Sequence, residues 1–144
     1  MREVLFRGFH ECENGDTIIT INERKIKGIW VYGYYCFRPK RRGAFGQTVS
    51  ELDFDIHYIV SPRGESYKVI PETVGQFTGQ SDKNGKKIFE SDIVKEYGEF
   101  IDYIDFERGS FVMRTKRVNR EFVFQDFSQI EVIGNIYDNV EVIK

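Results

Sequence analysis

The sequence predicts a mainly β protein of short strands and hairpins, on three observations. Aromatic residues make up 15% of the 144 residues, and aromatic side chains suit half-buried strands. The 13 glycines supply many turn positions. Leu52, Phe54 and Ile56 alternate with acidic residues, as on a strand with one buried face. No long amphipathic helix is evident, so we expect helix in fewer than about a quarter of the residues.

The first half of the chain contains strands expected at residues 28–37, 51–60 and 67–70, the last of them after a turn at 61–66. A linker is expected around Pro71 because Pro and polar residues interrupt the apolar pattern there. The linker divides the chain into an N-terminal β-rich segment, 1–70, and a C-terminal β-barrel-like segment, 71–144.

The second half has clearer turn signals. Asn84-Gly85 predicts a tight turn with Gly85 at positive φ. The strands expected after it are residues 88–97, a hairpin over 99–115 with its turn at 107–110, and residues 122–127 and 130–137. Turns that separate short strands at this spacing are typical of a sandwich or small barrel, and the strand order resembles an SH3-like barrel.

The hairpin over 99–115 has an imperfect alternation, because each face of its first strand carries a carboxylate among apolar residues. We expect a β-bulge near Asp102-Tyr103, which would turn Asp102 and Asp105 to water and Ile104 inward. Such a bulge would also curve the strand, as a small barrel requires.

Targeting segments are not evident in the sequence. The first residues lack the apolar run of a signal peptide, and no apolar stretch approaches the roughly 20 residues that span a bilayer. We therefore expect a protein of the bacterial cytoplasm. In that compartment Cys12 and Cys36 are expected to stay reduced.

Charge is unevenly distributed in this chain of net charge −2. Basic residues gather in two islands, 38–42 and 108–120. Basic islands are typical of phosphate-binding surfaces, although solvated loops also carry them. The candidate nucleic-acid-binding residues are Arg114, Lys116, Arg117 and Arg120.

Catalytic and metal-binding patterns are missing. The only histidines and cysteines, His10, His57, Cys12 and Cys36, are not spaced as zinc ligands, and we expect no metal and a structural role for His57. Phosphate-cradling glycine motifs and a nucleophile elbow are also missing, so we expect no cofactor and no enzyme activity. Asp82 and Asp92 are expected to serve turns and caps.

Residues 71–94 contain the motifs Gln-Phe-Thr-Gly (76–79), Asp-Lys-Asn-Gly (82–85) and Phe-Glu-Ser-Asp-Ile-Val (89–94). Together they resemble the signature of the YopX family. The opening residues 1–9, the segment WVYGYY (30–35) and the closing VIGNIYDN (132–139) are also similar to that family. The resemblance thus extends over the whole chain. Ser91 departs from it, because the family usually has Gly there, and a positive φ at this position would strain Ser91. Residues 38–50 match nothing in the family pattern and read as an insertion.

The resemblance implies an accessory protein of phages and prophages, with no catalytic residues to transfer. Two functions stay open. The first is a non-enzymatic interaction protein that assembles with copies of itself, because short strands leave sheet edges that invite pairing. The second is a nucleic-acid-binding module that uses basic hairpin loops, with Phe111 and Phe122 near the hairpin turn. The net negative charge favours the first.

Overall fold

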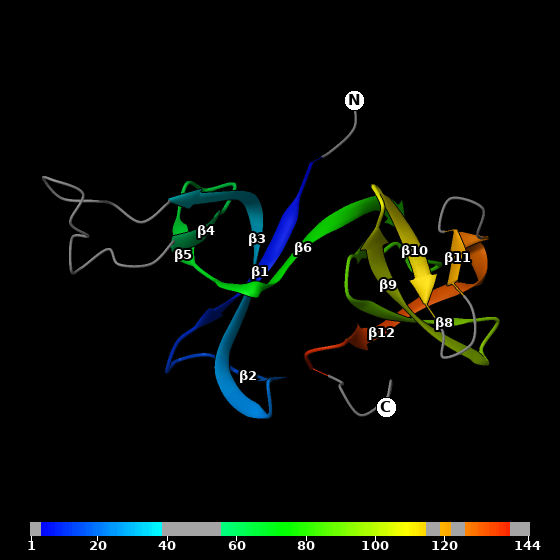
Figure 1. Ribbon diagram of the computed structural model, residues 1–144, viewed down its shortest axis with the longest axis horizontal. Coiled ribbons are helices and arrows are strands. Elements are labelled where there is room, and N and C mark those ends of the chain that lie inside the picture. Colours follow the sequence, from blue (N-terminus) through cyan, green and yellow to red (C-terminus); the bar gives the residue numbers. More distant parts are fainter. Residues whose placement is uncertain (1–3, 39–55, 115–118, 122–125, 139–144) are drawn as a thin grey trace, which may run out of the picture.

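The computed structural model describes residues 4–38, 56–114, 119–121 and 126–138, and forms two antiparallel sheets (Figure 1). This confirms the mainly β prediction. The only helical segment in the described residues is one 3-10 turn, η4 (Phe127–Gln129). No helix in that part of the chain is long and apolar enough to cross a membrane.

The first sheet has seven strands, in the order β5-β4-β3-β1-β6-β7 with β2 also paired to β3. They are β1 (Phe6–Glu11), β2 (Thr17–Ile21), β3 (Arg24–Arg38), β4 (Ile56–Val60), β5 (Ser66–Lys68), β6 (Ile70–Ser81) and β7 (Lys87–Phe89). The central strand β3 pairs with β2, β1 and β4 in turn along its length. Gly28 lies where β2 and β1 meet on β3. A Cβ there would stand 2.0 Å from the His10 carbonyl oxygen, so only glycine fits.

The second sheet has five strands, in the order β11-β10-β9-β8-β12. They are β8 (Asp92–Glu96), β9 (Phe100–Glu107), β10 (Ser110–Arg114), β11 (Asn119–Glu121) and β12 (Ile130–Asn135). The expected SH3-like barrel is not found, because among the described strands β11 and β12 are opposite edges of an open sheet. The turn before β7 covers the β12 edge, where the Lys83 N–H donates to the Ile130 carbonyl at 2.9 Å.

Strand β6 of the first sheet runs from β1 towards the second sheet (Figure 1), and the chain enters the second sheet after β7. Pro71, where a linker was expected, lies inside this 12-residue strand. Thr73, Gly75 and Phe77 are buried at every second position, which is strand periodicity. Because Pro71 lacks an N–H, it is placed near the strand end, where few ladder bonds are lost.

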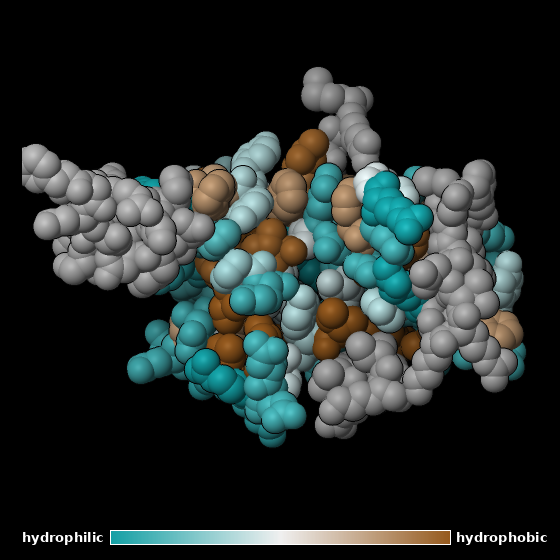
Figure 2. Space-filling model, in the orientation of Figure 1, coloured by the Kyte–Doolittle hydropathy of each residue, from teal (hydrophilic) through white to brown (hydrophobic). Residues whose placement is uncertain are grey.

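Two clusters of buried side chains differ in size. The larger lies against the second sheet and contains Ile88 of β7 together with Val94, Ile104, Met113, Ile130 and Val132. The smaller lies in the first sheet and contains Val31, Ile59 and Val69, with partly buried aromatic and aliphatic residues packed against them. In Figure 2 the hydrophobic residues gather near the middle of the visible face, and hydrophilic residues surround them.

The turn predictions are confirmed. Gly85 has a φ of +81°, and the Arg108-Gly109 turn, with φ of +51° and +82°, joins β9 to β10. The expected strand 122–127 differs from the structure, because Phe127 lies in η4. Residues 122–125, like residues 51–55 of another expected strand, lie outside the described residues.

The bulge predicted near Asp102 is wrong. The ladders of β9 with β8 and with β10 run without a register shift. Asp102 therefore stays on the same face as Ile104, and both side chains are buried. The unbroken backbone hydrogen bonds hold this register, although it turns a carboxylate inward. Asp105 lies on the opposite face, where it pairs with Arg114.

Candidate functional site

Arg7 lies between the two sheets and is buried, with 5% of its surface exposed. Its Nη1 is 2.7 Å from the Asp92 Oδ1 at the start of β8. Its Nη2 donates to the Glu90 carbonyl at 3.1 Å. A buried arginine needs a carboxylate partner, because removing an unpaired charge from water is costly. Asp92, itself 1% exposed, supplies it.

Two aromatic rings enclose the Arg7 guanidinium. Its carbon is 5.1 Å from the centre of the Trp30 ring and 5.0 Å from that of Phe89. Tyr32, two residues along β3, places its ring edge-on to Phe89 at 5.5 Å. Cation–π attraction is stronger where water is excluded, so these rings help to hold the charge in place.

The corner between β7 and β8 positions Asp92. Ser91 in this corner has a φ of +74°, the left-handed region that favours glycine. The predicted strain at Ser91 is therefore present. Asp92 Oδ2 accepts the Phe89 N–H at 2.8 Å, which is the capping role expected for it. Burial raises the pKa of Asp92, and the neighbouring Arg7 opposes that rise.

The segment after β12 reaches back to the first sheet. The Asn135 side-chain oxygen accepts the N–H groups of Tyr137 and Asp138 and so folds this segment. Asp138 then accepts the Trp30 Nε1–H at 3.2 Å, and the Tyr137 carbonyl accepts the Thr20 N–H at 3.0 Å. The Tyr137 hydroxyl donates to the Glu72 carbonyl. Burial raises the pKa of the Tyr137 hydroxyl.

We call this set the junction: Arg7, Trp30, Phe89, Glu90, Ser91, Asp92, Tyr137 and Asp138. The sequence motifs suggested none of these residues as a joint site, although each lies in a segment that carries the resemblance. Arg7 and Asp92 neutralise each other, and burial raises the pKa of Glu90. The junction therefore ties the two sheets together.

Asp82 acts as predicted, in a turn. Its Oδ1 accepts the N–H groups of Asn84 and Lys86, and its Oδ2 accepts the Val132 N–H at 2.8 Å. Burial opposes ionisation of Asp82, but these three donors outweigh it and hold the pKa below its ordinary value. The Asn84-Gly85 turn is thereby fixed to β12.

The predicted nucleic-acid-binding residues are only partly visible. Arg114 is 2.6 Å from Asp105 and 2.7 Å from Glu107, so its charge is already matched by two carboxylates. Lys116 and Arg117 lie outside the described residues, as does the side chain of Arg120. For these residues the nucleic-acid role stays a prediction.

The four residues considered for a metal site are two histidines with hydrogen-bond partners and two free cysteines. His57 Nδ1 forms a hydrogen bond of 2.6 Å with the Tyr35 hydroxyl. His10 Nδ1 forms one of 2.7 Å with the Lys68 carbonyl oxygen. Cys12 and Cys36 are free thiols. Within the described residues, no three His, Cys, Asp or Glu side chains are grouped to hold a metal ion.

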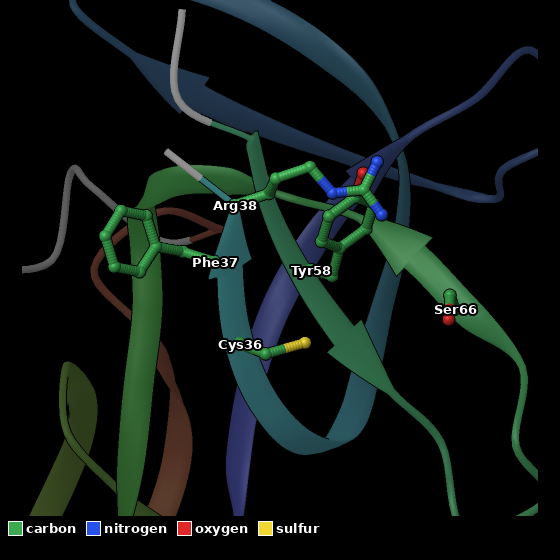
Figure 3. Close-up of a pocket in the computed structure, with 5 residues that line it drawn as sticks. All are labelled: Cys36, Phe37, Arg38, Tyr58 and Ser66. Carbon is green, nitrogen blue, oxygen red and sulfur yellow. The ribbon is translucent and has the colours of Figure 1, made fainter. Parts of the chain in front are cut away.

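A cavity of about 440 Å³ opens on the end of the first sheet that β3, β4 and β5 form. It is lined by Cys36, Phe37, Arg38, Tyr58 and Ser66 (Figure 3). The Arg38 guanidinium lies over the Tyr58 ring, 5.6 Å from its centre. In Figure 3 Phe37 points away from the other four side chains.

Comparison with known proteins identifies the family of this chain. The family model described as YopX protein matches residues 6–144, which include every residue of the junction. The crystal structure of protein EF1440 from Enterococcus faecalis is similar over 100% of both chains, at 21% identity and a TM-score of 0.46. No curated protein matches the chain.

Proposed function

This chain belongs to the YopX family, and we propose that it is a non-enzymatic phage or prophage accessory protein of the bacterial cytoplasm that assembles with copies of itself. The junction supports a role without catalysis, because Arg7 and Asp92 are buried and paired with each other. Asp82 is likewise occupied by backbone donors. A general acid or base must instead reach its substrate.

Self-assembly through strand edges has less support than the sequence suggested. The Tyr137 carbonyl covers the β2 edge at Thr20. The His10 side chain forms a hydrogen bond with the Lys68 carbonyl on β5. The Lys83 N–H donates to the Ile130 carbonyl on β12. Edges that are short or covered in this way resist strand addition from another chain. We therefore place the contact between copies on side chains.

The observation that carries the proposal is the apolar hairpin tip, which consists of Tyr97 in the turn after β8 and of Phe100 and Ile101 at the start of β9. These side chains are between 42% and 59% exposed and lie within five consecutive residues. Neighbouring exposed apolar side chains mark interaction sites. Lys95 and Glu99 flank them with opposite charges. A two-fold related copy would place each charge near its opposite, which suits a symmetric dimer.

Sedimentation velocity over about a hundredfold range of concentration tests the proposal, because self-association depends on concentration. We expect the parent protein to shift towards a larger species, and Phe100→Ser to remain a monomer. Ile18→Ser is the matched control, since Ile18 in β2 is 59% exposed but lies on the first sheet. A parent that sediments as a monomer throughout would refute self-assembly.

A further inference from the structure

The end of the first sheet that we call the arm consists of residues 34–38 of β3 together with β4 and β5. Tyr34 pairs with Val60 and Cys36 pairs with Tyr58 across the β3–β4 ladder. Because side chains alternate along strands, Tyr34, Cys36, Arg38 and Tyr58 share one face of the arm. Ile59, fully buried, lies on the opposite face, which covers the small core.

The first face is open and aromatic. Tyr34 is 65% exposed, the largest exposed fraction among the large hydrophobic and aromatic side chains of the described residues. Tyr58 is its diagonal neighbour across the ladder, roughly 7–8 Å away by strand geometry. The cavity of about 440 Å³ lies beside Tyr58, and Arg38 covers one side of that ring.

The arm is also basic. With the turn between β4 and β5 included, it carries Arg38, Arg63 and Lys68 against one acid, Glu65, in a chain of net charge −2. Glu65 lies in the turn and accepts a hydrogen bond from the Tyr67 hydroxyl, which places it outside the face. In the sequence Arg38 begins a basic island that continues through Lys40, Arg41 and Arg42.

We propose that this face of the arm binds single-stranded nucleic acid, with bases stacked on Tyr34 and beside Tyr58, and with phosphate bound by Arg38. Aromatic rings on an open sheet, flanked by cations, are what sequence-tolerant single-strand binding requires. A duplex hides the flat surfaces of its bases, so it gains only the phosphate contacts. The site is separate from the hairpin over 99–115 and from the apolar hairpin tip.

Fluorescence anisotropy with a labelled oligothymidylate of about 20 nucleotides tests the proposal, because a small β domain such as an OB fold covers roughly 4–16 nucleotides. We expect binding at low salt that weakens as salt rises. Tyr34→Ala should weaken binding about 5- to 150-fold, the range for loss of one stacked base. Arg38→Ala should make the slope of log affinity against log salt shallower by about 0.7, the value for one phosphate on a single strand.

Two control variants truncate exposed side chains that lie outside the arm. Arg24 at the start of β3 and Ile18 in β2 are exposed and lie away from the arm. Arg24→Ala and Ile18→Ala should keep the parent affinity. The proposal fails if the parent does not bind at low salt, if Tyr34→Ala and Arg38→Ala bind as the parent does, or if a duplex of the same length binds as tightly. It also fails if the arm variants change only the sedimentation of the protein, because the face would then be a contact between copies.

Discussion

The two sheets are held together in different ways. The second sheet packs on a cluster of six buried side chains, five from its own strands and Ile88 from β7. Short turns join β8 to β9 and β9 to β10. The cluster within the first sheet has three buried side chains with partly buried aromatic rings around them, and the junction attaches this sheet to the second. From this difference we infer that the junction with the second sheet stabilises the first sheet as much as its own buried side chains do.

The largest effect is expected at the junction. Arg7→Ala should lower the free energy of unfolding by about 3–5 kcal/mol, because Asp92 is left as an unpaired buried charge. The double variant Arg7→Met with Asp92→Leu should cost less than Arg7→Ala alone, since both charges are then removed. Urea denaturation measures both. If Arg7→Ala and the double variant lost the same free energy of unfolding, the ion pair would not link the sheets.

A core truncation in each sheet sharpens the comparison. Ile104→Ala should cost about 2–5 kcal/mol, because Ile104 is buried among well-packed neighbours. Ile59→Ala in the first sheet should fall near the lower end of that range. Its neighbours include the partly buried rings of Phe6, Tyr35 and Tyr67, which can move into the space. A larger loss for Ile59→Ala than for Ile104→Ala would reverse the ranking of the two cores.

The Asp82 turn, between β6 and β7 of the first sheet, binds the edge strand β12 of the second sheet. Asp82→Asn should cost about 1–3 kcal/mol at neutral pH, because an amide nitrogen at Oδ2 cannot accept the Val132 N–H. The folded-state pKa of Asp82 is below its ordinary value of 3.8, so its contribution is complete above that pH. It is lost as pH falls through the folded pKa. The stability difference between parent and variant should therefore shrink below about pH 4, and a constant difference would contradict it.

The smallest effect is expected at Ser91, in the corner between the sheets. Ser91→Gly should raise the free energy of unfolding by roughly 0.5–1 kcal/mol, because glycine adopts a φ of +74° without a Cβ clash. Ser91→Ala is the control, since it keeps the Cβ and loses only the hydroxyl. Thermal denaturation distinguishes them. Equal stability of the Gly and Ala variants would mean that φ at this corner is not strained.

Local features were predictable from the sequence, and distant contacts were not. Asn84-Gly85 and Gly109 mark turns by their own conformational preferences, so their positions were predicted correctly. Asp102 was misplaced because its pattern left two registers open, and the ladder with β8 decided between them. Ser91 was found through the family resemblance.

The junction was missed for a different reason. Arg7 looks like any exposed strand arginine in sequence, and nothing near it specifies a partner. The carboxylate that pairs with Arg7 is that of Asp92, which lies 85 positions later in the chain and in the other sheet. An arginine and an aspartate in separate motifs of one family signature were the available signal, although they become a pair only in the fold.

The bond from Trp30 to Asp138 joins residues 108 positions apart. On the ribosome the first sheet would emerge long before the segment that completes it. Strand β1 and the ring of Trp30 would wait, with the Arg7 charge unmatched, until β8 and then the residues after β12 had been synthesised. Contacts this distant in sequence slow folding and prolong the exposure of apolar surface. The nascent chain is therefore expected to be most vulnerable to proteases and to aggregation before residue 138 leaves the exit tunnel.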